Sequence, residues 1–246
     1  MAMSKPAAQS PAWLVLPTYN EAGNIEPFLE AVREKLPASA RVLIVDDNSP
    51  DGTGELADGL AARLDGVSVL HRERKEGLGP AYIAGFQRAL AEGAGLVLEM
   101  DSDFSHDPAY LPRLLEAGER ADVVIGSRYV SGGGVGDWSA ARRAISRGGS
   151  VYARFVLGVD VRDLTGGFKC FRREVLEAID LGSIQSRGYA FQVETTYRAI
   201  RHGFEVVEVP IVFRDRRTGS SKMDRKIVAE AIWRVPLLRF DGRAQG

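Results

Sequence analysis

Short apolar segments that alternate with amphipathic helical segments are the feature that most restricts how this chain folds. Several apolar runs, each too short for a helix, recur between residues 12 and 126. Between these runs, apolar residues return every three or four positions, as on one face of a helix. This alternation predicts an α/β fold with a mostly parallel sheet and helices on both faces. The expected strands cover residues 12–16, 41–45, 67–71, 96–100 and 123–126.

The chain after residue 127 is less regular, and no linker rich in proline or serine divides it from the first part. We therefore expect one domain over residues 12–240, preceded by a disordered tail of residues 1–11. Glycines at 132–134 and 136 indicate a flexible loop. The other elements expected here are helices over residues 142–157, 191–202 and 222–240, and strands over residues 167–171 and 205–213.

The composition excludes several classes of protein. Lys and Arg number 32 against 33 Asp and Glu, so the chain is not a polycation built for nucleic acid. Cys170 is the only cysteine, which rules out an intrachain disulfide and favours a reducing compartment. No segment is apolar enough to be expected as a signal peptide or a membrane span. We expect a cytoplasmic protein that is at most peripheral at the cytoplasmic face of a membrane.

The turns that follow the expected strands are the expected ligand site, because parallel sheets bind ligands at the carboxyl ends of their strands. Asp46 and Asp47 follow the second strand. They either cap a turn or bind the ribose or base of a nucleotide. The first strand runs into PTYNEAGN, which lacks the G-x-G-x-x-G of a dinucleotide-binding turn. This absence argues against a dinucleotide-dependent dehydrogenase.

Asp101 and Asp103 follow the fourth strand in the sequence MDSDFSHDP. Two carboxylates so close together repel each other, so either water or a cation must offset their charge. Mg²⁺ or Mn²⁺ bound to a diphosphate would do so, since hard cations take one or two carboxylates together with phosphate oxygens. Ser105 and His106 are further candidates for the metal shell. We interpret His106 as a local hydrogen-bonding group.

Basic residues gather around the glycine-rich loops of the second part. Guanidinium groups suit phosphate recognition, so a second basic cluster beside a metal-bound diphosphate predicts two phosphate-bearing substrates. The alternative interpretation is a set of ordinary solvated faces. The residues concerned are Arg128, Arg142, Arg143, Arg147, Arg214, Arg216, Arg217 and Lys222.

Several motifs together resemble those of polyprenol (dolichol) phosphate mannose synthases, which are family 2 glycosyltransferases with a GT-A fold. The motifs run in order over residues 12–226. PTYNE and D-x-D are typical of family 2 in general, whereas GSRYV and D-R-x-x-G-x-S-K are more specific to the polyprenol-phosphate enzymes. The resembling stretches are VLPTYNEAGNI, VDDNSPDGT, MDSDFSHDP, IGSRYVSGG, Trp138 with Arg142, TGGFKCF, and the segment from Phe213 to Lys222.

The resemblance implies a nucleotide-binding half over about residues 12–126 and an acceptor half over about residues 127–240. Asp101, Asp103 and Ser105 are implied as metal ligands, with Ser102 nearby, although some relatives have glutamine in place of Ser105. Arg216 and Lys222 are implied as catalytic groups over the donor diphosphate. The nucleoside pocket is implied to contain Pro17, Tyr19, Glu21, Val45 and Asp47, and the lipid phosphate site Arg128, Arg142 and Ser146.

The implied reaction transfers mannose from GDP-mannose to a polyprenyl phosphate with inversion. Such an acceptor is already ionised at neutral pH, so the chain needs no strong general base. A UDP-sugar such as UDP-glucose as donor, and a nucleotide-sugar-binding module without catalysis, remain alternatives. Some relatives have membrane helices, an acyltransferase region or a partner subunit, which leaves a membrane-embedded subunit or an acyltransferase as a candidate partner.

The segment over residues 222–240 carries apolar residues at helical spacing among basic ones. It either packs on the core or lies in a membrane surface with Trp233, Leu237 and Leu238 at the edge of the bilayer. The membrane surface is therefore a further expected partner.

Overall fold

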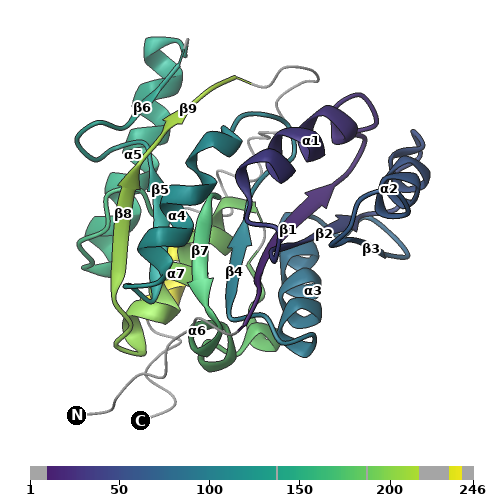
Figure 1. The fold of residues 1–246 in the computed structure, drawn as a ribbon. Helices are drawn as coiled ribbons and strands as arrows, with labels where there is room; N and C mark the ends of the chain where they lie inside the picture. The colour runs from purple at the N-terminus through teal and green to yellow at the C-terminus, as the bar shows by residue number, and fades with distance from the viewer. Residues whose placement is uncertain (1–9, 137, 187, 216–232, 240–246) are drawn as a thin grey trace.

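The computed structural model describes residues 10–136, 138–186, 188–215 and 233–239. A seven-stranded sheet forms the centre, with the strand order β3-β2-β1-β4-β7-β5-β8 (Figure 1). Six of its strands run parallel to one another, and β7 is antiparallel to both of its neighbours. The strands are β1 Ala12–Thr18, β2 Arg41–Asp46, β3 Val67–His71, β4 Leu96–Glu99, β5 Val123–Ser127, β7 Lys169–Arg172 and β8 Val206–Pro210.

Helices cover both faces of this sheet, as the sequence predicts. Alternate residues of each strand point to opposite faces. In β1, Leu14 and Leu16 pack in one core with α1, α2 and α4, while Trp13 and Val15 pack in the other with α3, α5, α6 and α7. The helices are α1 Ile25–Lys35, α2 Thr53–Ala61, α3 Leu78–Ala91, α4 Leu111–Gly118, α5 Ala140–Leu157, α6 Arg173–Ala178 and α7 Gly188–Arg201, with short 3-10 turns at Pro108–Tyr110 and Leu181–Ser183.

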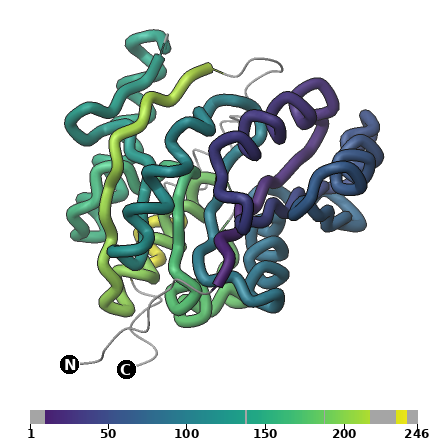
Figure 2. Tube along the Cα trace, in the orientation of Figure 1, coloured from purple at the N-terminus to yellow at the C-terminus, as the bar shows by residue number. Residues whose placement is uncertain are grey.

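The second half of the chain completes the same sheet (Figure 2). β7 inserts between β4 and β5, so the strand that precedes the Asp101 turn lies in the middle of the sheet, as expected. The register pairs Glu99 of β4 with Lys169 of β7. A buried acid and a buried base thus meet directly behind that turn.

The single strand expected over residues 205–213 is wrong, because the chain changes sheets there. β8 ends at Pro210, which has no N–H with which to continue a ladder. Ile211 is buried, and its N–H donates to the carbonyl of Ser127. β9 Val212–Phe213 then pairs with β6 Gly134–Val135, so part of the glycine-rich segment that was expected to be a flexible loop is a short strand.

Close packing of α3 on the sheet depends on Gly85. A Cβ atom at this position would lie 2.3 Å from Cγ1 of Val15 in β1. We predict that Gly85→Ala lowers the free energy of unfolding by about 1–3 kcal/mol, because the helix must move away from the sheet. Chemical denaturation measures this change.

Gly59→Ala is the matched control. Gly59 lies in α2, and a Cβ atom there would meet no heavy atom within 4 Å. This variant should gain up to about 1 kcal/mol from the higher helix propensity of alanine. Equal stability of Gly85→Ala and the wild type would contradict the close packing of α3.

Candidate active site

The candidate site lies at the carboxyl edge of the sheet, where β1, β2 and β4 end side by side. Pro17 pairs with Val45 and Thr18 with Asp46 in the register of β1 and β2. The hydroxyl of Ser102, in the turn after β4, donates to the carbonyl of Pro17 at 3.2 Å. Residues predicted from three separate turns are therefore neighbours in the structure.

Asp46 and Asp47 differ in what their carboxylates hold. Asp46 accepts hydrogen bonds from the hydroxyls of Thr18 and Ser49 and from the Ser49 N–H, so it fixes its own turn. Asp47 forms an ion pair with Arg72 and accepts the backbone N–H groups of Glu76 and Gly77, each at 3.3 Å. Asp47 thus anchors the segment after β3 at the edge of the nucleoside pocket that the sequence predicts.

Glu21 and Tyr19, which are also predicted for the nucleoside pocket, lie in the turn after β1. Glu21 is buried, accepts a hydrogen bond from the Asn24 side chain at 2.7 Å, and donates its backbone N–H to the Thr53 hydroxyl. Tyr19 presents its ring to the Lys75 ammonium, which lies 3.6 Å from the ring centroid. The turns after β1 and β3 therefore meet above the end of β2.

The turn after β4 holds its two aspartates in different ways. Oδ1 of Asp103 accepts the N–H of Ser105 at 2.9 Å and its hydroxyl at 2.5 Å, and Asp103 is buried. Oδ1 of Asp101 accepts from the Tyr82 hydroxyl at 3.4 Å. Ser105, a predicted metal ligand, orients Asp103 in this structure, and a direct bond from Ser105 to a metal stays a prediction.

His106 lies in this turn as a local hydrogen-bonding group, in agreement with its interpretation from sequence. Its Nδ1 accepts the backbone N–H of Asp101 at 3.4 Å. Burial lowers the pKa of His106 to about 4, although Asp103 opposes the shift. The imidazole is therefore neutral at pH 7, which matches its role as an acceptor.

Beneath the turn lies a buried ion pair that sequence reasoning missed. Nζ of Lys169 lies 3.5 Å from Oε1 of Glu99, and both side chains are fully buried. Lys169 also donates to the backbone carbonyl and to the side-chain oxygen of Gln192, at 2.8 and 2.5 Å. Burial raises the pKa of Glu99 to about 7; Lys169 opposes this shift and Asp101 adds to it.

A second buried ion pair involves Arg128, which the sequence predicts as a ligand of the lipid phosphate. Its Nε and Nη2 donate to the carboxylate of Asp163 at 2.8 and 2.6 Å, and its backbone N–H donates to the same carboxylate at 2.8 Å. Asp163 is completely buried. Arg128 thus has a structural role that the sequence did not indicate, and contact with a phosphate stays a prediction.

Among the described residues, carboxylates outnumber cations in this cluster. The charges of this cluster shift one another's pKa values. Asp101 and Lys169 act on the pKa of Glu99, and Asp163 also acts on that of Lys169. Asp103, Asp163 and Arg128 act on the pKa of His106. Among the described residues that act on this cluster, Lys169 and Arg128 are the cations. Two of these four carboxylates, Asp101 and Asp103, lie in the turn after β4.

Arg142 and Ser146 extend from α5 toward the same edge. The Arg142 guanidinium stacks on the ring of Trp138, with Cζ 4.1 Å from the ring centroid. Asp215 accepts from both of these residues, at 2.5 Å from Nη1 of Arg142 and 2.9 Å from Nε1 of Trp138. The Ser146 hydroxyl accepts from the hydroxyl of Tyr129 at 2.7 Å.

Phe213 connects this group to the carboxylate turn. Its ring centroid lies 5.0 Å from that of His106 and 5.3 Å from that of Trp138. The next residue, Arg214, donates its backbone N–H to the carbonyl of Ser105 at 3.0 Å. The residues predicted for the donor and those predicted for the acceptor are therefore joined through one segment.

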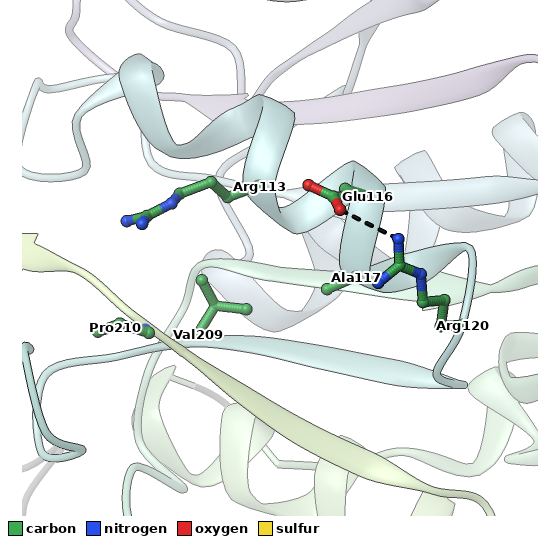
Figure 3. Close-up of a pocket in the computed structure, with 6 residues that line it drawn as sticks. All are labelled: Arg113, Glu116, Ala117, Arg120, Val209 and Pro210. Carbon is green, nitrogen blue, oxygen red and sulfur yellow. Dashed lines mark hydrogen bonds and ion pairs between the residues drawn. The ribbon is translucent and has the colours of Figure 1, made fainter.

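Two predicted catalytic residues, Arg216 and Lys222, lie outside the described residues. A hollow on another part of the surface, between α4 and β8, contains none of the predicted site residues (Figure 3). It is lined by Arg113, Glu116, Ala117, Arg120, Val209 and Pro210.

Comparison with known proteins agrees with this architecture. Residues 13–180 match Glycosyl transferase family 2. The undecaprenyl-phosphate mannosyltransferase of Micrococcus luteus is 49% identical over 232 residues, covering 94% of this chain and 95% of the relative. The polyprenol monophosphomannose synthase of Mycolicibacterium smegmatis is 48% identical over 232 residues, covering 94% and 87%.

Solved structures share the fold at lower identity. Glucosyl-3-phosphoglycerate synthase from Mycobacterium tuberculosis in complex with phosphoglyceric acid matches with a TM-score of 0.68 and 20% identity, over 94% of this chain and 81% of that chain. The same enzyme in complex with Mn²⁺ and UDP-glucose matches with a TM-score of 0.68 and 19% identity, over 96% and 81%.

This chain has a GT-A fold, the class of glycosyltransferase fold with a mostly parallel sheet and a carboxylate pair at the end of its central strand. The chain belongs to glycosyl transferase family 2.

The two arginines predicted for the lipid phosphate should differ in their effect on stability. We predict that Arg128→Ala lowers the free energy of unfolding by about 3–5 kcal/mol, because it leaves the Asp163 carboxylate buried without its ion-pair partner. Arg142→Ala should cost less than about 1 kcal/mol, since the pair of Arg142 with Asp215 is partly exposed. Urea unfolding of both variants tests the difference, and a fully stable Arg128→Ala protein would contradict it.

Proposed function

We propose that this chain is an inverting mannosyltransferase that moves mannose from GDP-mannose to a polyprenyl phosphate. The observation that carries the proposal is the connection through Phe213 between the carboxylate turn and the group of Trp138 and Arg142. One side of Phe213 suits a metal-bound diphosphate and the other suits a second anion. The names of the relatives from Micrococcus luteus and Mycolicibacterium smegmatis support a mannosyl donor and a polyprenyl phosphate acceptor.

The donor would lie across the ends of β1, β2 and β4. Its guanosine would occupy the pocket around Asp47, where Tyr19 and Lys75 meet. The hydrogen bond from Ser102 to Pro17 joins the turn after β4 to the end of β1. Ser102 would therefore lie where the nucleoside of the donor meets its diphosphate. In this proposal Arg216 and Lys222 act on the donor diphosphate, and Pro17, Glu21 and Val45 complete the nucleoside pocket.

Asp101 and Asp103 would hold Mg²⁺ or Mn²⁺ together with the donor. Their carboxylate oxygens are ligands of the kind that these cations take, and the turn after β4 brings both carboxylates to the carboxyl edge of the sheet. Among the described residues no group of three His, Cys, Asp or Glu side chains could hold a metal, which fits a cation that takes its other ligands from the diphosphate and water. The bound cation would stabilise negative charge on the leaving GDP.

The acceptor phosphate would meet Arg142 and Ser146, which lie on the inner side of α5. A phosphate is already ionised at pH 7, so its oxygen can attack the anomeric carbon without a general base. Direct displacement then inverts that carbon and gives a β-linked product. The protein contributes position and electrostatic stabilisation in this reaction.

The acceptor claim gives a direct test. We predict that a short-chain polyprenyl phosphate is mannosylated, whereas the corresponding polyprenol is not, because the alcohol is not ionised at pH 7 and would need a general base to attack. Arg142→Ala should raise the Michaelis constant for the phosphate about ten- to a hundredfold through loss of one charge-assisted contact. The Michaelis constant for GDP-mannose should change little. Product formation by mass spectrometry measures both.

A panel of nucleotide sugars with the same acceptor separates the alternatives. Faster transfer from a UDP-sugar than from GDP-mannose would reject the proposed donor. Equal reaction of the alcohol and the phosphate would reject the proposed acceptor. Nucleotide-sugar binding without transfer to any acceptor would favour a binding module instead of an enzyme.

A further inference from the structure

The outer side of α5 is unusually apolar for a solvent-exposed helix. Phe155 is 86% exposed, Ile145 60% and Val151 56%. A phenylalanine as exposed as Phe155 contributes little to a folded core, and neighbouring exposed apolar residues mark an interaction surface. Figure 1 shows α5 on the side of the molecule that carries β8 and β9.

Val151 and Phe155 belong to one continuous stripe of small and apolar residues along α5. The stripe consists of Ala144, Gly148, Val151 and Phe155, whose spacings of four, three and four residues place them on one face of the helix. Ile145 lies beside them. The opposite face packs on the core through Ser150, Ala153 and Leu157, so the apolar stripe faces away from the protein.

A row of arginines lies beside the stripe. Arg143, Arg147 and Arg154 are exposed and repeat at spacings of four and seven residues, so they share a neighbouring face. α5 contains four arginines and no acidic residue. Arg154 forms an ion pair with Asp160, whereas Arg143 and Arg147 have no acidic partner among the described residues. An exposed apolar stripe beside a row of cations is the pattern of a helix that lies in an anionic lipid surface.

A neighbouring segment packs against the core side of α5. Val235 and Leu238 are buried in the same core as Ala153 and Leu157 of α5, and Arg239 donates to the carbonyl of Val156 at 2.9 Å. The other side of this segment exposes Trp233 at 78% and Leu237 at 48%. Leu238, which was expected at the edge of the bilayer in the membrane interpretation, instead packs on the core, whereas Trp233 and Leu237 are exposed. Residues 222–232 of the expected helix lie outside the described residues, and contact of the segment with a membrane stays a prediction.

We propose that the outer face of α5, defined by Ile145, Val151 and Phe155 with Arg143 and Arg147, docks onto an anionic membrane surface. The inference rests on the proposed function, because a lipid acceptor must be reached in its bilayer. The inner face of the same helix carries Arg142 and Ser146. Insertion of the outer face would therefore place the proposed phosphate site at the depth of the lipid headgroups. The part of the chain that the structure describes contains no helix that is long and apolar enough to cross a membrane.

Vesicle binding tests this surface. The full chain is mixed with vesicles of equal parts phosphatidylcholine and phosphatidylglycerol and then floated on a density gradient. We expect the wild type to float and the double variant Val151→Ser with Phe155→Ser to bind about ten- to a hundredfold more weakly, because two large apolar side chains lose their burial in lipid. The charge-reversal variant Arg143→Glu with Arg147→Glu should also lose binding, and the wild type should bind less to pure phosphatidylcholine.

Leu56→Ser is the matched control, because Leu56 is 45% exposed on α2, in the other half of the chain. It should float like the wild type. Activity separates this proposal from the proposed function. The Val151 and Phe155 double variant should mannosylate a water-soluble short-chain acceptor at the wild-type rate and lose turnover on an acceptor embedded in vesicles. Absence of transfer by the wild type to either acceptor would reject the function, whatever the vesicle result.

Three results would overturn the docking surface. The first is a wild type that does not float with anionic vesicles. The second is a double variant that floats as well as the wild type. The third is a wild-type dimer in light scattering that becomes a monomer in the double variant, which would assign this face to a second copy of the chain.

Discussion

The concentration of carboxylates in β4 and the turn that follows it is the constraint on which the rest of the site depends. Asp101 and Asp103 follow the central strand, and Glu99 lies buried two residues before Asp101. Burying unpaired carboxylates is costly, so the fold supplies Lys169 to one acid and Arg128 to another. Asp101 and Asp103 bring two further carboxylates to the carboxyl edge, where, in the proposed function, a divalent cation and a diphosphate would fit.

The antiparallel strand β7 is how the chain meets this constraint. It brings Lys169 opposite Glu99 in the middle of the sheet, where no solvent reaches either group. The same strand joins the second half of the chain to the first, so the segments that carry Arg142 and Asp215 return to the Asp101 turn. One sheet therefore holds both proposed substrate sites, and Phe213 packs between them.

The sequence predicted the parallel part of the fold well, because apolar runs and helical periodicity there are strong local signals. The five strands expected before residue 127 all form. The second half was harder to predict, because its strands depend on pairing between residues that are far apart in the sequence. Pro210 gave a local signal for the end of β8, but the pairing of β9 with β6 could not be predicted locally. Likewise, Lys169 inside an apolar strand was not recognised from the sequence as a buried charge, and only the register identifies Glu99 as its partner. Asp163 gave no signal of its own, so Arg128 was predicted as a phosphate ligand and its buried ion pair was missed.

Calorimetric titration with GDP tests most directly whether the carboxylates at the end of β4 bind a nucleotide through a divalent cation. The affinity for GDP should fall at least about tenfold when EDTA replaces Mn²⁺, because the diphosphate then faces the carboxylates without a cation. Asp103→Ala should bind GDP with the same low affinity in Mn²⁺ and in EDTA, and guanosine, which has no phosphate, should bind the wild type equally in both. Equal affinity of the wild type for GDP in Mn²⁺ and in EDTA would contradict the account.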